Sequence, residues 1–507
     1  MLASRSCLCL VFISLTTLAA ALLGLAPAPV VAQTPPANSN APLTSEANPA
    51  APGKAPPVSF IKDIAPIFKE SCFGCHGPKS PKGKLDMTKY ATLRKGGTKD
   101  DPIVDGKPDD SYLVDVLIAT DRQRMPPLET GDPLPKDKIE LVKRWIAEGA
   151  KLDADVKPDA DLVRELRKRY VPPTPPVAYP YPVTITALAF TPDNKQLVVG
   201  GHHELNVYDV ASGRLEKRLS TRSRRAMAMS FLPDGKLIVA GGRPGEEGDV
   251  RVYNLQAPGK KVGELTLLDG VNDKAVLVAH LGDSDDEILG LAVSADGKKV
   301  AAGGCDRIVQ VWDISDGVDK AKSVAAIENH ADWVFGVAFS PDAKLLYTAS
   351  RDKTAKVWDL NAKESLVTFP DHQNTVYDVL PAQAGKAGLS VGEDNQLRLW
   401  NTTGDKAGKS LRNGGHGRPV FRLAAVPGKP MVVTCSADGT LKSWDTEKLT
   451  AGKTMGGFSD HVYAVAVSPD GNLVAGGAFN GEVRIFKLAD GSLVKTFNAS
   501  PGYTEKK

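Results

Sequence analysis

The chain has 507 residues, more than one ordinary domain holds, so two or more domains are expected. Hydrophobic residues make up 42% of the chain, which is enough to build packed cores. The formal net charge of +3 is close to balance. The chain therefore lacks the strong basic excess that is typical of nucleic-acid-binding proteins, and its charge gives no support for that function.

The first 32 residues have the pattern of a secretory signal peptide. Arg5 gives a positive start, an apolar stretch runs from Leu8 to Leu25, and a small-residue cleavage site ends at Ala32. An uncleaved membrane anchor is the alternative, because the apolar run is long for a signal peptide. We therefore expect an exported protein of the periplasm or cell envelope. Membrane association is expected only through an uncleaved N-terminal segment.

Composition divides the rest of the chain. Residues 33–56 are rich in Pro, Ala, Asn and Ser, which predicts a disordered linker. Residues 57–155 have helical periodicity, with helices expected at 111–119 and 136–148. Residues 156–182 hold a short charged helix and a polyproline run, and we expect them to form a Pro-rich linker.

The strongest chemical signal is the motif Cys72-Phe-Gly-Cys75-His76. Two thiols three positions apart can each form a thioether with a haem vinyl group, and the next histidine can reach the iron from the proximal side. This pattern is typical of c-type haem attachment. A redox dithiol does not need the histidine. A zinc site needs two more ligands, whereas residues 57–155 hold no other Cys or His. The motif predicts one covalently bound haem c.

Two methionines are candidates for the distal iron ligand. Met125 is followed by two prolines, which fix an extended backbone and can hold its side chain stiffly. Met87 comes soon after His76 and is better suited to packing. A distal side without a protein ligand is the remaining alternative. Ligation by His and Met would raise the potential and leave no open coordination site, which suits electron transfer.

Residues 57–155 resemble the planctomycete-type cytochrome c module. The matching features are the C-x-x-C-H motif, Gly83-Lys-Leu-Asp86, Gly96-Gly97, Gly106-Lys-Pro-Asp-Asp-Ser111, Met125-Pro-Pro and Trp145-Ile-Ala-Glu-Gly149. The resemblance implies a small all-α, cytochrome c-like haem domain that transfers electrons. It implies His76 and Met125 as the axial iron ligands.

A repeat begins near residue 183. A Pro-Asp-Gly-like phrase precedes a β-rich run in most repeats, and a later strand ends in an aromatic residue. These aromatics are Tyr208, Tyr253, Trp312, Trp358, Trp400, Trp444 and Phe486. Their spacing is mostly 42 to 46 residues, with one interval of 59. This period predicts an all-β propeller of seven four-stranded blades over residues 183–498, followed by a tail of residues 499–507. We expect the ring to close without a strand shared between its ends. Residues 256–285 are expected to form a long loop on one rim.

The repeats resemble WD40 repeats, with Trp-Asp pairs at Trp312, Trp358 and Trp444. The resemblance implies a structural network of a His, a Ser or Thr, an Asp and the Trp. The fitting residues are His330, Ser350, Asp352 and Trp358 in one repeat, and His416, Ser436, Asp438 and Trp444 in another. A third repeat has His372, Asp394 and Trp400, with Gly392 in place of the hydroxyl.

The sequence thus favours a multidomain, exported electron carrier whose propeller docks a protein partner on its rim. No catalytic residue is recognised, so the protein is interpreted as an electron carrier and binding module more than as an enzyme. Two alternatives stay open: a haem-containing enzyme with its active site in the propeller, and a redox-sensing scaffold. The electron donor and acceptor are not indicated, and no nucleic-acid partner is expected.

Overall fold

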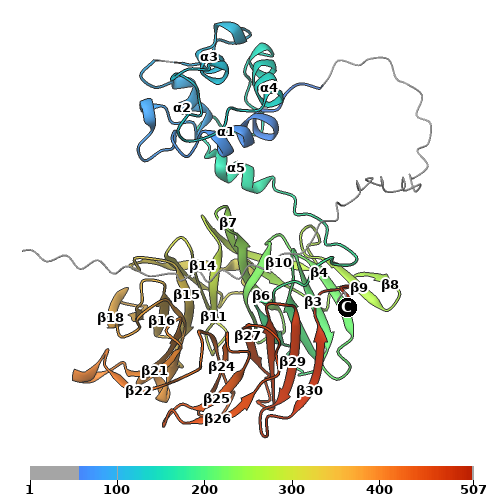
Figure 1. Cartoon of the computed structure of the whole chain (residues 1–507), viewed down its shortest axis with the longest axis vertical. Coiled ribbons are helices and arrows are strands. Elements are labelled where there is room, and N and C mark those ends of the chain that lie inside the picture. The colour runs from blue at the N-terminus through green and yellow to red at the C-terminus, as the bar shows by residue number, and fades with distance from the viewer. Residues whose placement is uncertain (1–55, 100, 505–507) are drawn as a thin grey trace, which may run out of the picture. The chain divides into compact units, whose positions relative to one another are not determined.

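The structure is a computed structural model that describes residues 56–99 and 101–504. The expected signal peptide, nearly all of the expected linker 33–56 and the last three residues lie outside the described residues. Figure 1 shows helices in the first part of the described chain and strands in the rest. Within the described ranges, no helix has both the length and the apolar character needed to cross a membrane.

The described residues from 56 to 170 form helices and no β-strand. The α-helices are α1 (Ala65–Ser71), α2 (Tyr90–Lys95), α3 (Tyr112–Ile118), α4 (Lys136–Ala147) and α5 (Leu162–Lys168). Shorter helical turns are η1 (Phe60–Ile64), η2 (Lys82–Lys84) and η3 (Pro108–Asp110). The helices expected at 111–119 and 136–148 are confirmed as α3 and α4.

An aromatic cluster forms the core of this helical region. α4 buries Trp145 on its apolar face, and the Trp145 ring lies 5.1 Å from Phe60 and 6.3 Å from Phe68 between centroids. The indole N–H of Trp145 donates to the Lys151 carbonyl at 2.9 Å, so its one polar group is satisfied. Gly149, with a φ of 99°, ends the helix in a conformation that favours glycine.

Side-chain and backbone bonds tie distant parts of the helical region together. The Asp153 carboxylate accepts from the Ser59 hydroxyl at 2.6 Å and from the Ile61 amide at 2.8 Å, at the start of η1. The Leu162 amide donates to the Thr88 carbonyl at 2.9 Å, and the Leu162 side chain is buried. The helical region therefore continues through α5, past the boundary that we expected at residue 155.

Residues 188–498 form 30 strands in seven sheets, and these sheets are the blades of a propeller. Blade 1 begins with β1 (Leu188–Phe190), β2 (Gln196–Gly200), β3 (Glu204–Asp209) and β4 (Leu215–Ser220). Blade 2 holds β5 (Arg225–Phe231), β6 (Leu237–Arg243), β7 (Glu247–Tyr253) and β10 (Leu277–Ser284). The prediction of seven blades is confirmed.

The other five blades each take four consecutive strands. Blade 3 is β11 (Ile288–Val293), β12 (Lys299–Gly304), β13 (Ile308–Asp313) and β14 (Lys322–Glu328). Blade 4 is β15 (Val334–Phe339), β16 (Leu345–Ser350), β17 (Ala355–Asp359) and β18 (Glu364–Phe369). Blade 5 is β19 (Val376–Ala382), β20 (Ala387–Gly392), β21 (Gln396–Asn401) and β22 (Ser410–Gly415). Blade 6 is β23 (Val420–Ala425), β24 (Met431–Ser436), β25 (Leu441–Asp445) and β26 (Ala451–Met455). Blade 7 is β27 (Val462–Val467), β28 (Leu473–Ala478), β29 (Glu482–Lys487) and β30 (Leu493–Asn498).

The segment 256–285 is not the long rim loop that we expected. It holds β8 (Lys260–Val262) and β9 (Leu265–Asp269), which form a hairpin, and then β10. β9 pairs in parallel with β4, so blade 1 has six strands in the order β1-β2-β3-β4-β9-β8. Leu268 of the hairpin packs in one cluster with Leu219 of blade 1 and Tyr253 of blade 2. The insertion therefore bridges two blades by covering apolar surface that both present.

The recurring Pro-Asp-Gly-like phrase has a common hydrogen-bond pattern. In blade 4, the Ser340 hydroxyl donates to Asp342 at 2.6 Å and accepts from the Leu345 amide at 2.9 Å. The phrases that begin near residues 191, 294 and 468 repeat this pattern. Side chains that bond nearby backbone stabilise tight turns. This bond pattern explains why the phrase recurs between the first and second strands.

The seven third-strand aromatics fill the spaces between blades. All seven are buried, and each lies in its blade's third strand. Trp400, for example, stacks on Phe369 of the preceding blade with centroids 4.9 Å apart and planes within 4°. One apolar ring per blade thus gives every interface a packed centre.

The ring closes without a strand shared between its ends, as we predicted, because β1–β4 all belong to blade 1 and β27–β30 all belong to blade 7. The closing contacts come from the segment before β1. The Ile185 amide donates to the Ala478 carbonyl at 3.2 Å, and the Val183 amide donates to the Ser500 hydroxyl at 2.8 Å. The rings of Tyr208 and Phe497 lie 4.7 Å apart across the joint. In Figure 1 the red strands of blade 7 lie beside the green strands of blade 1.

Candidate functional site

The Cys72–His76 motif lies at the end of α1, where the helix turns over into a loop. The Cys72 amide still donates to the Phe68 carbonyl at 2.8 Å, while the Cys75 and His76 amides both donate to the Cys72 carbonyl, at 3.1 Å and 2.9 Å. This turn gathers both thiols and the imidazole around one carbonyl group. Both cysteines are free and partly exposed, so neither thiol is committed to a disulfide.

The orientation of the His76 ring is fixed by a backbone contact. Its Nδ1 lies 3.2 Å from the Leu85 carbonyl oxygen. A carbonyl only accepts, so Nδ1 carries the proton and the neutral ring keeps its lone pair on Nε2. The loop that supplies this carbonyl is held against the motif by the Met87 amide, which donates to the His76 carbonyl at 2.9 Å. An imidazole held through Nδ1 with Nε2 as an acceptor has the form that binds iron.

The electrostatics of the motif argue against a reactive thiolate. Burial, and after it the neighbouring Cys75, raise the pKa of the Cys72 thiol to about 12. Redox-active cysteines have lowered pKa values instead. The described residues contain no group of three or more His, Cys, Asp or Glu side chains arranged to hold a metal ion. The residues present therefore fit thioether attachment of a haem better than a catalytic dithiol.

The two methionines differ in burial. Met87 is 2% exposed and lies next to the backbone of His76, as expected for a packing residue. Met125 follows α3, is only partly buried, and its amide donates to the Val116 carbonyl at 2.8 Å. The adjacent Arg124 is buried and donates to the Gly131 carbonyl at 2.6 Å, which fixes the loop. Met125 as the distal ligand stays a prediction.

Blade 4 contains a buried hydrogen-bond network, with one change from the predicted residues. His330 Nδ1 lies 2.8 Å from Asp352, and its Nε2 lies 2.7 Å from the hydroxyl of Thr348. The Trp358 indole N–H donates to the same hydroxyl at 2.9 Å. The hydroxyl that joins His330 to Trp358 therefore belongs to Thr348. The prediction that Ser350 supplies this hydroxyl is wrong.

Ser350 has a different role at the end of β16. Its hydroxyl donates to the Asp332 carbonyl and accepts from the Asp352 amide, both at 3.1 Å. Side chains alternate along a strand, so residues 348 and 350 lie on the same face. Sequence spacing alone does not choose between them. The His330 ring extends past Ser350, the last residue of β16, and bonds the Thr348 hydroxyl two residues earlier in the strand.

Blades 5 and 6 repeat the network with the same offset. In blade 6, His416 Nε2 lies 2.7 Å from the Thr434 hydroxyl, which also accepts from Trp444 at 2.9 Å, so Ser436 is not the bridge. Asp438 lies 2.9 Å from His416 Nδ1. In blade 5 the bridge is the Ser390 hydroxyl, 2.8 Å from His372 Nε2 and 3.1 Å from the Trp400 nitrogen. The network in blade 5 is therefore complete, and Gly392 does not replace a missing hydroxyl.

The carboxylates of these networks are held ionised. Burial by itself would raise the pKa of Asp352 and Asp394, but hydrogen bonds from His330 and His372 lower it well below its usual range. Burial lowers the pKa of His416. All three histidines are at most 9% exposed and each is bonded at both nitrogens. They are structural groups of the blades.

The sequence interpretation missed one feature of the propeller: a cluster of aromatic side chains and an arginine at the mouth of its central channel. Phe335, Tyr377, Phe421 and Tyr463 recur at intervals of 42, 44 and 42 residues, at the second position of the innermost strand. The strands β15, β19, β23 and β27 carry them. The same periodicity that counted the blades would have found these four residues. Nothing in the pattern pointed to Arg422, which occurs in one blade alone.

Comparison with known protein families gives two matches that agree with this division of the chain. Residues 72–129 match the family Planctomycete cytochrome C. Five segments match the WD domain, G-beta repeat: residues 273–313, 321–359, 363–401, 408–445 and 452–487. Each matched repeat begins with the outermost strand of one blade and continues with three strands of the next. The matches thus place a segment similar to planctomycete cytochrome c before WD40 repeats in the propeller, and blade 1 lies outside the matched segments.

Curated relatives cover only parts of the chain. "Anaphase-promoting complex subunit cdh1" of Dictyostelium discoideum is 32% identical over 271 residues, which are 49% of this chain and 34% of that protein. Human "Striatin" is 33% identical over 95 residues, 17% of this chain and 12% of the relative. "Small ribosomal subunit protein RACK1y" of Oryza sativa is 25% identical over 178 residues and is covered over 52% of its length. The chain thus spans no more than about half of these relatives.

Proposed function

We propose that the protein is an exported c-type cytochrome that transfers electrons, with its propeller as a docking surface for a protein partner. Cys72 and Cys75 would hold one haem c through thioether bonds, His76 would bind the iron on the proximal side, and Met125 on the distal side. When bound, the haem supplies a one-electron couple at the iron. The propeller would bring the carrier to its partner.

The His76–Leu85 contact carries this proposal. A histidine directly after two free cysteines, with Nδ1 already committed to a carbonyl at 3.2 Å, is oriented for ligation through Nε2. The match of residues 72–129 to the planctomycete cytochrome family supports the same assignment. Ligation by two protein side chains leaves no open coordination site, which favours electron transfer over oxygen chemistry.

Export is supported by the sequence of the first 32 residues and by the attachment motif, since c-type haem is attached outside the reducing cytoplasm. The proposal of a protein partner is supported by the names of two relatives. These names describe subunits of larger assemblies, an anaphase-promoting complex and a small ribosomal subunit. The N-terminus of protein recovered from the periplasm would begin at Gln33 if cleavage follows Ala32.

The decisive experiment is an optical spectrum of protein matured in an oxidising compartment with haem attachment machinery. We expect peroxidase stain on a denaturing gel, a reduced c-type band, and a weak methionine–iron band in the oxidised protein. Cys72→Ala should reduce or abolish the stain. Colourless protein without stain would rule out the carrier function.

Two methionine variants of similar volume form a matched pair for the distal ligand. Met125→Leu should abolish the weak methionine–iron band and leave the haem attached. Met87→Leu, at the 2% exposed packing position, should keep that band. Loss of the band in Met87→Leu alone would assign the distal iron to Met87 and contradict this ligand set.

A further inference from the structure

The mouth of the propeller channel is built from β-bulges. In six blades the pairing of the innermost strand shifts by one residue near its start, and the extra residue is Met227, Leu289, Phe335, Tyr377, Phe421 or Tyr463. A bulge leaves its extra residue outside the ladder and redirects its side chain. Five of these six residues, all except the buried Leu289, line the same cavity.

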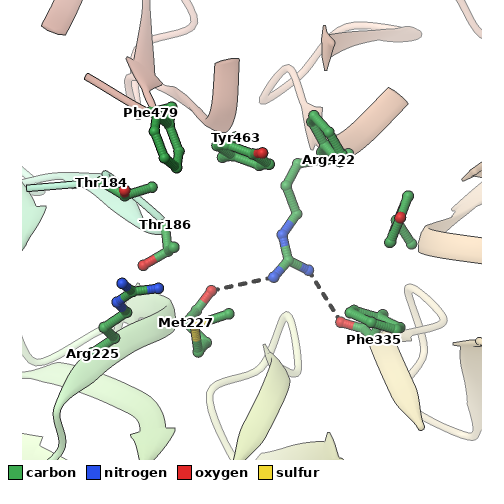
Figure 2. A pocket seen from close by; sticks show the side chains of 10 residues that line it. Thr184, Thr186, Arg225, Met227, Phe335, Arg422, Tyr463 and Phe479 are labelled. Carbon is green, nitrogen blue, oxygen red and sulfur yellow. Dashed lines mark hydrogen bonds between the residues drawn. The ribbon is translucent and has the colours of Figure 1, made fainter. Parts of the chain in front are cut away.

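Along one side of the mouth these residues form a continuous arc of aromatic rings. Centroids lie 5.2 Å apart for Phe335 and Tyr377, 5.4 Å for Tyr377 and Phe421, and 4.5 Å for Phe421 and Tyr463. Phe479 extends the arc, 6.2 Å from Tyr463, and is 52% exposed. The arc lines one side of a cavity of about 430 Å³ (Figure 2). This volume lies in the range of small-molecule sites.

Arg422 forms the floor of the cavity. Its side chain extends from blade 6 to the opposite side of the channel, as Figure 2 shows, and donates to the carbonyls of Met227 and Phe335 at 3.3 Å and 3.1 Å. A third bond, of 2.9 Å, goes to the Leu289 carbonyl. A guanidinium has five N–H groups. These three bonds hold the charge in place and leave two N–H groups for a ligand.

Arg225 adds a second positive charge to the wall of the cavity. Its guanidinium forms no ion pair with any described residue. Glu287 is close enough to interact with it, but burial raises the pKa of Glu287 to about 7, so this carboxyl is only partly ionised at neutral pH. Beneath the floor, the buried Asp378 carboxylate accepts from the amides of Val379 and Leu423, both at 2.9 Å, and it also interacts with the charge of Arg422. The cavity lining itself contains two arginines and no acidic side chain.

We propose that this cavity binds a small aromatic carboxylate, with the carboxylate on Arg225 and Arg422 and the aryl ring inside the arc. The site is separate from the haem-binding motif and does not depend on the proposed electron transfer.

The charges select this class of ligand over its neighbours. Aromatic rings by themselves attract cations, but two guanidinium groups within the same cavity repel them. A neutral aryl group would leave the free N–H groups of Arg422 without an acceptor. Bonds between a guanidinium and a carboxylate are among the strongest that a protein forms. A planar ligand ring whose centroid lies roughly 4.5–7 Å from those of several aromatic side chains is stabilised by stacking and edge contacts.

The test is calorimetric titration of the full chain with 3-phenylpropionate. We expect a dissociation constant of about 0.1–1 mM for a ligand of this size. The neutral 3-phenylpropanamide and the cationic 3-phenylpropylamine should bind at least about tenfold more weakly. Equal binding of the acid, the amide and the amine, or no binding of the acid, would overturn the proposal.

Variants assign the binding to the cavity. Arg225→Gln should weaken 3-phenylpropionate about tenfold and leave the amide unchanged. Tyr463→Leu should weaken both the acid and the amide. Arg214→Gln is the matched control, because Arg214 is an exposed arginine of blade 1 that pairs with Glu264 away from the channel. Unchanged affinity in folded Arg225→Gln would overturn the assignment. Binding of an aspartate-rich peptide, without binding of the aryl acid, would also overturn the proposal, because the occupant would then be a protein segment.

Discussion

Replacing Thr348 by Val tests the blade network at its centre. The side chain keeps its shape and loses the hydroxyl that lies 2.7 Å from His330 Nε2 and accepts from Trp358 at 2.9 Å. Thr348 is fully buried, so no solvent replaces the hydroxyl. Each buried polar group left without a partner costs about 1–3 kcal/mol. With two such groups, we expect the free energy of unfolding to fall by about 3 kcal/mol.

The assay is denaturant unfolding of the full chain followed by tryptophan fluorescence, which reports mainly on the propeller because five of the six tryptophans lie there. Ser350→Ala should cost about 1 kcal/mol, since its hydroxyl bonds backbone groups only. Thr368→Val, at an exposed position of β18 in the same blade, should stay within about 0.5 kcal/mol of the parent. A larger loss for Ser350→Ala than for Thr348→Val would refute the assignment of the bridging hydroxyl.

Three more outcomes follow from single positions, each measured by the same unfolding assay. Gly392→Ser gives blade 5 the serine that blades 4 and 6 have at this position, yet it should lower the free energy of unfolding by about 1–3 kcal/mol. A Cβ at residue 392 would lie 2.5 Å from the Thr375 carbonyl oxygen. A gain in stability would contradict this prediction. Arg422→Met should cost about 3 kcal/mol by removing the donor of three inward carbonyls, whereas Arg214→Met should be nearly neutral. Glu287→Gln should match the parent at pH 4 and exceed it by about 2 kcal/mol at pH 8. Burial raises the pKa of Glu287 to about 7, so the folded state binds this proton more tightly than the unfolded state, and the resulting stability is lost as the pH rises through about 7. Parallel pH profiles for the two proteins would exclude this effect.

Features that repeat with the blade period were predictable from the sequence. The third-strand aromatics, from Tyr208 to Phe486, gave the number of blades because every blade interface needs a large apolar ring at the same place. The turn phrases gave the strand boundaries because their Ser or Thr and Asp side chains form the same local bonds each time. The helix α4 was predictable for a similar reason, since its apolar face repeats at helical spacing.

Features that depend on contacts between distant segments were not predictable. The choice between Thr348 and Ser350 depends on how far the His330 ring reaches into the blade, and both hydroxyls lie on the same strand face. The hairpin β8–β9 is short, and it is stabilised by the pairing of β9 with the edge of β4 in the neighbouring blade, which lies far away in the sequence. At the haem motif, the spacing predicts His76 as an iron ligand, but neither the motif nor the match at Gly83–Asp86 indicated that the Leu85 carbonyl orients the His76 ring.

The position of Arg422 links the stability of the ring to the chemistry of its mouth. Bulges in the innermost strands turn backbone carbonyls toward the channel, where the strand ladder does not satisfy them. A ring closed without a shared strand also gains from any bond that joins non-neighbouring blades. One guanidinium meets both needs, because it bonds carbonyls of blades 2, 3 and 4 from blade 6. The same bonds fix a positive charge at the floor of an aromatic cavity. It follows that a substitution at Arg422 changes stability and ligand binding together, whereas Arg225 reports on binding alone.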